Sequence, residues 1–184
     1  LTARAVVLAT DAQQASALVT GRRAPSWSGC ATLYFAAAAS PLDSPLLMLN
    51  GVRGSGPVNH LCVPSDVQPS YAPTGQALIS ATIVNPSGAD DAALDRAARA
   101  QLGEWFGADV LRSWRTLGVV RVPQSLPRSI PRPETRDAAV RLAPRLVACG
   151  DYLETPSING ALRSGRRAAD AVLQELGESS ESAA

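Results

Sequence analysis

The chain contains no lysine, one histidine, three cysteines and only 4% aromatic residues. Its 17 basic residues are therefore all arginine, and they nearly balance 16 acidic residues, giving a formal net charge of +1. This balance excludes the strong positive field expected of a nucleic-acid-binding protein. Arginine without lysine, together with abundant alanine, indicates biased genomic base composition rather than a polyanion site.

The scarcity of histidine and cysteine restricts the possible chemistry. With His60 alone, a metal site needing several imidazoles is excluded, and any Ser-His-Asp triad would depend on this residue. His60 lies in the strand-like run 58–63, which favours a packed or hydrogen-bonded role. Cys30, Cys62 and Cys149 lack metal-ligand spacing, and their odd number is a poor disulfide framework. We therefore expect buried, reduced thiols and no metal.

Long apolar runs and targeting patterns are also missing. No stretch reaches the roughly 18 apolar residues of a membrane-spanning helix, and the first residues lack a secretory pattern. The sequence therefore predicts a protein of the cytoplasm or of an organelle interior such as the plastid. It is compatible with peripheral membrane contact.

The most informative segment begins with the apolar run Leu146–Cys149, which is typical of a strand buried on both faces. Gly150 allows a turn or a close approach to a ligand. Asp151 then stands at the carboxyl end of the strand, where ligands of open α/β sheets bind. A carboxylate at this position can accept hydrogen bonds from the hydroxyl groups of a ribityl or ribose chain.

A helix is predicted to begin at Pro156 and Ser157. Small residues recur along it and predict close packing of one face on a neighbour. Free N–H groups in its first turn can meet a partial negative charge. The small positions are Gly160, Ala161, Ser164, Gly165, Ala168 and Ala169.

This order of residues resembles the closing flavin motif of the superfamily that contains phytoene desaturases, protoporphyrinogen oxidases and flavin amine oxidases. The resemblance implies FAD as the cofactor, with Asp151 near its ribityl and pyrophosphate part. It also implies that the helix start faces the flavin pyrimidine edge and stabilises negative charge at N1 and O2. The cofactor contacts predicted in this way are Gly150, Asp151, Pro156, Ser157, Ile158, Asn159 and Ala161. The catalytic residues are unknown, since no acid or base has a persuasive placement.

The segment Ala3–Asp11 resembles the strand that returns the chain of these flavoproteins to the FAD-binding domain. Their glycine-rich dinucleotide fingerprint is absent, because Gly51–Gly56 has the wrong spacing and predicts a hairpin or loop. This absence, with Leu1 as the first residue, predicts the C-terminal part of a longer flavoprotein. Its expected partner is an N-terminal FAD-binding segment or chain.

The middle of the chain predicts an antiparallel sheet with helices. Strands are expected at 28–36, 46–52, 59–63, 76–84 and 117–122, and helices at 11–18, 90–106 and 109–114. Trp105 and Phe106 are expected to pack in the core. The segment Pro123–Pro133 predicts a stiff connector. Alternatively, it forms a wall near the flavin, with Gln124, Ser125 or Leu126 lining the substrate side.

Together these features predict a mixed α/β fold: an antiparallel substrate-domain sheet with helices, plus the terminal strand and helix of a Rossmann-like FAD-binding domain. The expected division is 1–20 as strand and helix of the FAD-binding domain and 21–133 as the substrate-binding domain. The segment 134–177 is the FAD-binding strand, loop and helix, and 178–184 is a disordered tail.

The predicted function is an FAD-dependent oxidoreductase that removes hydride from a small apolar substrate, such as a carotenoid or terpenoid. Thr155–Ser157 replaces the aromatic that amine oxidases tend to carry before the helix, which disfavours amines. A protoporphyrinogen oxidase, an amine oxidase-like enzyme, a reduced-flavin isomerase and a non-catalytic binding module remain alternatives. The chain alone is expected to be inactive without the N-terminal nucleotide-binding part.

Overall fold

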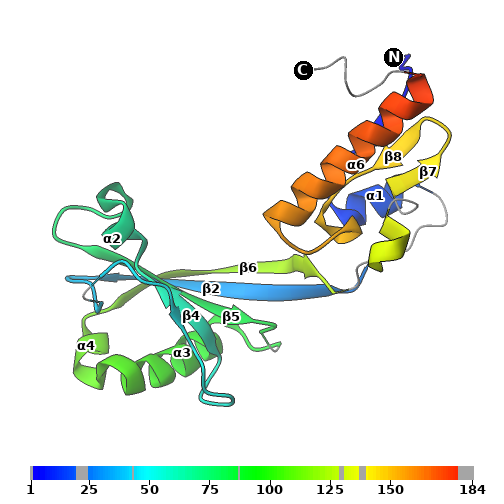
Figure 1. Ribbon diagram of the computed structural model, residues 1–184. Coiled ribbons are helices and arrows are strands. Elements are labelled where there is room, and N and C mark those ends of the chain that lie inside the picture. Colours follow the sequence, from blue (N-terminus) through cyan, green and yellow to red (C-terminus); the bar gives the residue numbers. More distant parts are fainter. Residues whose placement is uncertain are drawn as a thin grey trace. The chain divides into compact units, whose positions relative to one another are not determined.

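The computed structural model describes residues 2–19, 25–42, 44–86, 88–128, 131–136 and 140–177 (Figure 1). The chain forms two compact units. The first joins Leu1–Trp27 to Leu126–Ala184, and the second is Ser28–Ser125. The tail predicted at 178–184 lies outside the described residues. The assignment of 1–20 and 134–177 to an FAD-binding domain and of 21–133 to a substrate-binding domain remains a prediction.

The second unit is built on a five-stranded sheet in the order β3-β4-β5-β2-β6. The pairs β2–β5, β4–β5 and β3–β4 are all antiparallel. The predicted antiparallel sheet is therefore confirmed. Its strands are β2 (Trp27–Ala37), β3 (Met48–Leu49), β4 (Val58–Cys62), β5 (Ala77–Val84) and β6 (Arg115–Pro127).

One face of this sheet carries the hydrophobic core, because alternate residues of each strand point to the same side. Leu33 and Phe35 of β2 are fully buried, as is Ile79 of β5. They belong to one cluster with buried residues of α3 (Asp91–Phe106) and α4 (Ala108–Arg112). Figure 1 shows both helices on the same side of the sheet.

Aromatic residues complete this core. Trp114 is buried, and its ring centroid lies 5.6 Å from that of Phe35. Trp105 and Phe106 are partly buried against the same cluster, so their predicted packing role is confirmed.

Gln101 ties α3 to the sheet through two buried hydrogen bonds. Its Oε1 accepts from the backbone N–H of Val58 at 2.7 Å, and its Nε2 donates to the Val58 carbonyl at 3.1 Å. The register of β4 against β5 shifts immediately after Val58. The amide of Gln101 therefore satisfies the peptide groups at this irregularity. Gly56 leaves room for it, since a Cβ there would lie 2.5 Å from Gln101 Oε1.

The opposite face of the sheet is half-buried and more polar. The hydroxyl oxygens of Thr32 and Thr82 lie 3.2 Å apart. The registers place Tyr34 opposite Ser80, and His60 opposite Thr82. Nδ1 of His60 lies 3.2 Å from Nδ2 of Asn59, which confirms the hydrogen-bonded role expected of this histidine. The short helices α2 (Pro64–Val67) and η1 (Pro69–Tyr71) follow β4 along the chain.

Two predicted elements differ from the structure. The strand expected at 46–52 contains only Met48–Leu49. The connector expected to begin at Pro123 is instead strand as far as Pro127. Proline lacks the N–H donor that a central strand needs on both sides. Strand β6 tolerates prolines because it lies at the edge of its sheet.

The first unit contains a three-stranded sheet in the order β1-β8-β7. Strand β1 (Val6–Leu8) runs parallel to β8 (Leu146–Ala148), so both predicted strands are present. Strand β7 (Arg141–Ala143) pairs antiparallel with β8 and was not predicted. The helices are α1 (Ala12–Leu18), α6 (Ile158–Leu176), η2 (Pro133–Thr135) and η3 (Asp151–Leu153). Within the described part of the chain, no helix has the length and apolarity to cross a membrane.

Replacing Gln101 with Met should lower the free energy of unfolding by about 2–4 kcal/mol, because two buried peptide groups of Val58 lose their partners. Urea denaturation followed by circular dichroism would measure the change. The matched control is Glu104→Gln, at an exposed position of the same helix, which should stay within about 0.5 kcal/mol. Equal stability of the two variants would contradict this role of Gln101.

Candidate functional site

The candidate site begins where β8 ends. Val147 and Ala148 are buried, and the backbone N–H of Gly150 donates to Ser164 Oγ of α6 at 3.1 Å. A Cβ at Gly150 would lie 2.3 Å from the ring of Tyr152. Gly150 therefore lets the chain turn sharply between the strand and η3 while keeping contact with the helix.

Asp151 follows directly and is half-buried at the start of η3. Among the described residues, its carboxylate makes no hydrogen bond or ion pair. The turn is held by its own backbone: Leu153 N donates to Gly150 O at 3.1 Å, and Glu154 N donates to Asp151 O at 3.0 Å. The ordered turn therefore presents a carboxylate whose acceptor positions are not used by any described residue.

The N-terminus of α6 supplies N–H groups next to this turn. Ser157 is the N-cap, and its Oγ accepts from Gly160 N at 3.0 Å. The side chain of Ile158 is 81% exposed, and Asn159 is also exposed. No described residue accepts a hydrogen bond from the N–H groups of these two residues, so they can meet negative charge on a ligand.

Gly160 permits an unusually close approach of helix and loop. A Cβ at this position would lie 1.9 Å from the carbonyl oxygen of Thr155. The buried positions along the same face of α6 are Gly160, Ser164, Ala168 and Ala171. The predicted small face is therefore only partly correct. Ala161 and Ala169 are exposed, and a Cβ at Gly165 would meet open space.

Sequence reasoning did not identify Glu154, which lies in this loop and has a buried side chain. Its Oε1 accepts from Arg136 Nη1 at 2.6 Å and lies 3.5 Å from Arg163 Nε. Its Oε2 contacts Arg167 Nη2. The available signal was an acidic residue followed at 9 and 13 positions by arginines on one helix face.

Several reactive or aromatic residues have other roles. Burial raises the pKa of the Cys149 thiol, which keeps the sulfur protonated and poorly nucleophilic. All three cysteines are free thiols. Tyr152, like Trp114 in the second unit, is buried within a hydrophobic cluster. The described residues include no group of three His, Cys, Asp or Glu side chains placed to hold a metal ion.

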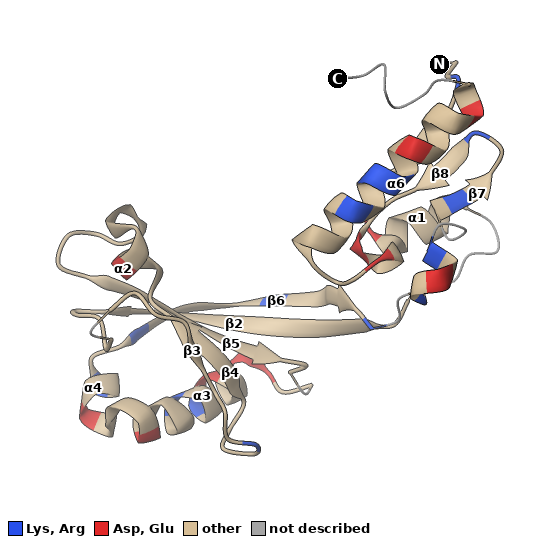
Figure 2. Cartoon of the chain, in the orientation of Figure 1, with Lys and Arg blue, Asp and Glu red and all other residues tan. Residues whose placement is uncertain are grey.

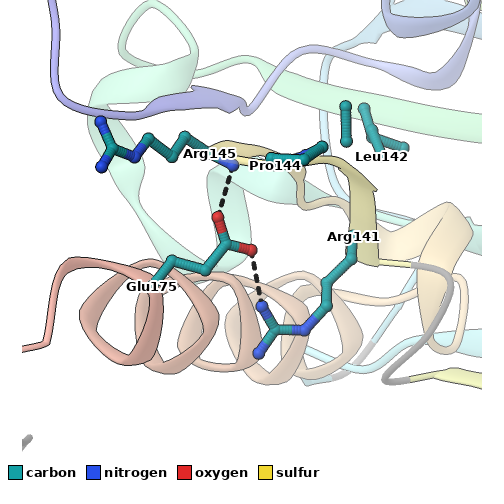
Figure 3. Close-up of a pocket in the computed structure, with 6 residues that line it drawn as sticks. Arg141, Leu142, Pro144, Arg145 and Glu175 are labelled. Carbon is teal, nitrogen blue, oxygen red and sulfur yellow. Dashed lines mark hydrogen bonds and ion pairs between the residues drawn. The ribbon is translucent and has the colours of Figure 1, made fainter.

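Other hollows are lined by residues outside this loop. One, of about 200 Å³, belongs to the second unit and is lined mainly by apolar residues. Another, of about 510 Å³, lies at the β7–β8 hairpin in the first unit. There Glu175 accepts from Arg141 Nη1 at 2.8 Å and from the backbone N–H of Arg145 (Figure 3). Glu175 thereby ties the C-terminal end of α6 to the hairpin.

A family described as flavin containing amine oxidoreductases has a sequence pattern that matches residues 2–173. The chain belongs to this family. The cofactor of the flavin-containing amine oxidoreductases is FAD, as the resemblance implied. No curated protein matches the chain.

Solved structures show the same fold at low sequence identity. A candidate protoporphyrinogen oxidase from Exiguobacterium sp. 255-15 matches 96% of the chain with a TM-score of 0.66 and 14% identity. A reduced UDP-galactopyranose mutase matches 83% with a TM-score of 0.58 and 12% identity. An oxidoreductase from Methanosarcina mazei matches 79% with a TM-score of 0.52 and 12% identity. The chain spans 42%, 34% and 35% of these three proteins, respectively.

The residues of the loop fit the family's cofactor. Asp151 is a half-buried acceptor without a partner among the described residues, and the exposed start of α6 offers N–H donors. An FAD molecule presents the complementary groups, namely ribityl hydroxyls and the flavin N1 and O2 atoms. The cofactor contacts expected of Gly150, Pro156 and Ala161 remain predictions.

Replacing Gly160 with Ala should destabilise the protein by about 2 kcal/mol or more, because the new methyl group overlaps the carbonyl of Thr155. Gly165→Ala is the matched control on the same helix. It should leave stability unchanged or raise it by up to about 1 kcal/mol, since alanine has the higher helix propensity. Thermal unfolding of both variants measures the difference, and a harmless Gly160→Ala would refute the close approach.

Proposed function

We propose that this chain supplies the C-terminal cofactor contacts and the substrate-binding sheet of an FAD-dependent oxidoreductase. The proposal rests on one observation: within the described part of the chain, the half-buried Asp151 carboxylate and the first N–H groups of α6 have no hydrogen-bond partner. When bound, FAD supplies the hydride-accepting chemistry.

The chain's own residues have defined parts in this proposal. The carboxylate of Asp151 accepts hydrogen bonds from cofactor hydroxyls and thereby orients the cofactor. The N–H groups of Ile158 and Asn159, aligned with the dipole of a 19-residue helix, favour negative charge on the pyrimidine edge. No side chain of the loop is assigned a proton-transfer step.

The remaining part of the cofactor site is proposed to come from an N-terminal FAD-binding segment or chain. Strand β1 supports this partner, because it is the edge of the sheet among the described residues and carries Val6 and Val7, each 46% exposed. An exposed apolar edge strand favours further strand pairing. A cytoplasmic or plastid location is part of the same proposal.

An apolar molecule, such as a carotenoid or terpenoid, is the first proposed substrate. The hollow of about 200 Å³ in the second unit supports it, since Ala36, Leu78, Leu117 and Pro73 contribute to its lining. Removal of a hydride from a C–H bond of such a molecule, with loss of a proton from the neighbouring carbon to water, would leave a C=C bond. At about 200 Å³, the hollow would hold only a part of such a substrate.

A tetrapyrrole such as protoporphyrinogen is the second proposed substrate. It is favoured by two polar residues, Arg115 and Gln76, which also line the hollow. The residues Thr32, Thr82 and Ser80 add hydroxyl groups to the half-buried face of the same sheet. These groups suit an apolar ring system with carboxylate substituents. Turnover of purified substrates of both classes would separate the candidates.

Asp151→Asn in the protein with its native upstream sequence should weaken FAD binding by about 10- to 100-fold, because a charged acceptor is lost. Titration of the FAD-free protein, followed by flavin fluorescence, measures the dissociation constant. Glu104→Gln, an exposed position of the second unit, serves as the control and should bind FAD like the unmodified protein. An unmodified protein that stays colourless with excess FAD would favour the non-catalytic binding module. Unchanged affinity in Asp151→Asn alone would remove only the assignment of this residue.

A further inference from the structure

The loop that carries the proposed cofactor contacts is held by a buried carboxylate, Glu154, that is not one of the predicted contact residues. The side chain of Glu154 is 3% exposed and is surrounded by the guanidinium groups of Arg136, Arg163 and Arg167. Figure 2 shows the basic bands on α6 beside the acidic loop that precedes the helix. A carboxylate is expensive to bury unless it is paired, so these arginines are required for its position.

The three arginines come from different parts of the first unit. Arg136 follows η2, whereas Arg163 and Arg167 are four residues apart on α6 and therefore share one helix face. One carboxylate thus connects the segment 131–136, the loop 150–157 and the helix α6. Arg163 Nη2 also lies 3.3 Å from Thr155 Oγ1, which adds a second tie to the same loop.

The connection reaches Asp151 through a single turn of backbone. Glu154 N donates to Asp151 O, and Leu153 N donates to Gly150 O. These bonds make 150–154 one turn, in which the first residues face the proposed ligand and the last residue is anchored by arginines. A shift of the Glu154 side chain must therefore move the turn that sets the direction of the Asp151 carboxylate.

We propose that Glu154 is a positioning residue for the FAD site. This inference rests on the proposed function, since it assumes that Asp151 and the start of α6 bind FAD. Glu154 does not touch the cofactor in this account. It fixes the turn and the helix start in the arrangement that binds FAD, and its charge neutralises guanidinium groups that would otherwise repel one another.

The variant Glu154→Gln tests this role in the protein with its native upstream sequence. The amide keeps the size of the side chain, but its NH₂ group faces arginine donors that require an acceptor. FAD affinity should fall by roughly tenfold or more. The visible circular dichroism of any bound flavin should also change, because the asymmetric surroundings of the ring change.

Glu175→Gln is the matched control. Glu175 joins the same helix to the β7–β8 hairpin through Arg141 and Arg145, so it also bridges α6 to another segment. Glu175 lies in the last turn of α6, whereas the proposed FAD contacts lie at the first turn, beside Ser157. Its replacement should reduce thermal stability while leaving FAD affinity within about twofold of the unmodified protein. Equal losses of FAD affinity in the two variants would overturn the positioning role, because a general loss of stability would then explain both.

Amide hydrogen exchange in the FAD-free protein separates this inference from the proposed function. Glu154→Gln should speed exchange at Leu153 and Glu154 N–H, which close the turn, whereas Glu175→Gln should not. Unchanged exchange in Glu154→Gln would overturn the inference even if the protein binds FAD normally. If the unmodified protein binds no FAD, the proposed function fails and the assignment of Glu154 as a cofactor-positioning residue fails with it.

Discussion

The close approach of α6 to the loop before it is the constraint on which the candidate site depends. At Gly160 the helix leaves no room for a side chain beside the Thr155 carbonyl, and at Ser164 it accepts a hydrogen bond from Gly150. These two contacts set the distance between strand end and helix start. As a result, a carboxylate and free helical N–H groups belong to one short segment, which is the combination that a flavin nucleotide can use.

Ion pairs of Glu154 hold the same segment in place. Glu154 is buried among arginines from two other segments, while Asp151, three residues earlier, has no partner among the described residues. The two acids therefore have opposite roles. A buried, paired carboxylate stabilises the geometry, and a half-buried, unpaired one remains available to a ligand.

Much of this arrangement could be predicted from local sequence. The apolar run before Gly150, the N-cap at Ser157 and the alternation in β2 and β5 all follow from short-range periodicity and capping, and the structure has these elements. Strand β7 was missed because its residues, Arg141–Ala143, begin with an arginine and lack the continuous apolar run of β1 and β8. The Glu154 cluster depends on contacts between separate segments. The helical spacing of Arg163 and Arg167 predicts that they share a face, but no local pattern predicts that Glu154 packs against it or that Arg136 joins the cluster. Which small residues of α6 are buried likewise depends on the segments that pack against the helix, and local sequence does not show these segments.

The central claim is that the turn at Asp151 and the start of α6 hold the flavin. A crystal structure of the FAD complex, with the native upstream sequence present, tests it most directly. The account predicts that flavin O2 or N1 lies within about 3 Å of the N–H groups of Ile158 or Asn159, and that Asp151 accepts a hydrogen bond from the cofactor. An FAD molecule bound without contact to residues 150–161 would contradict the account.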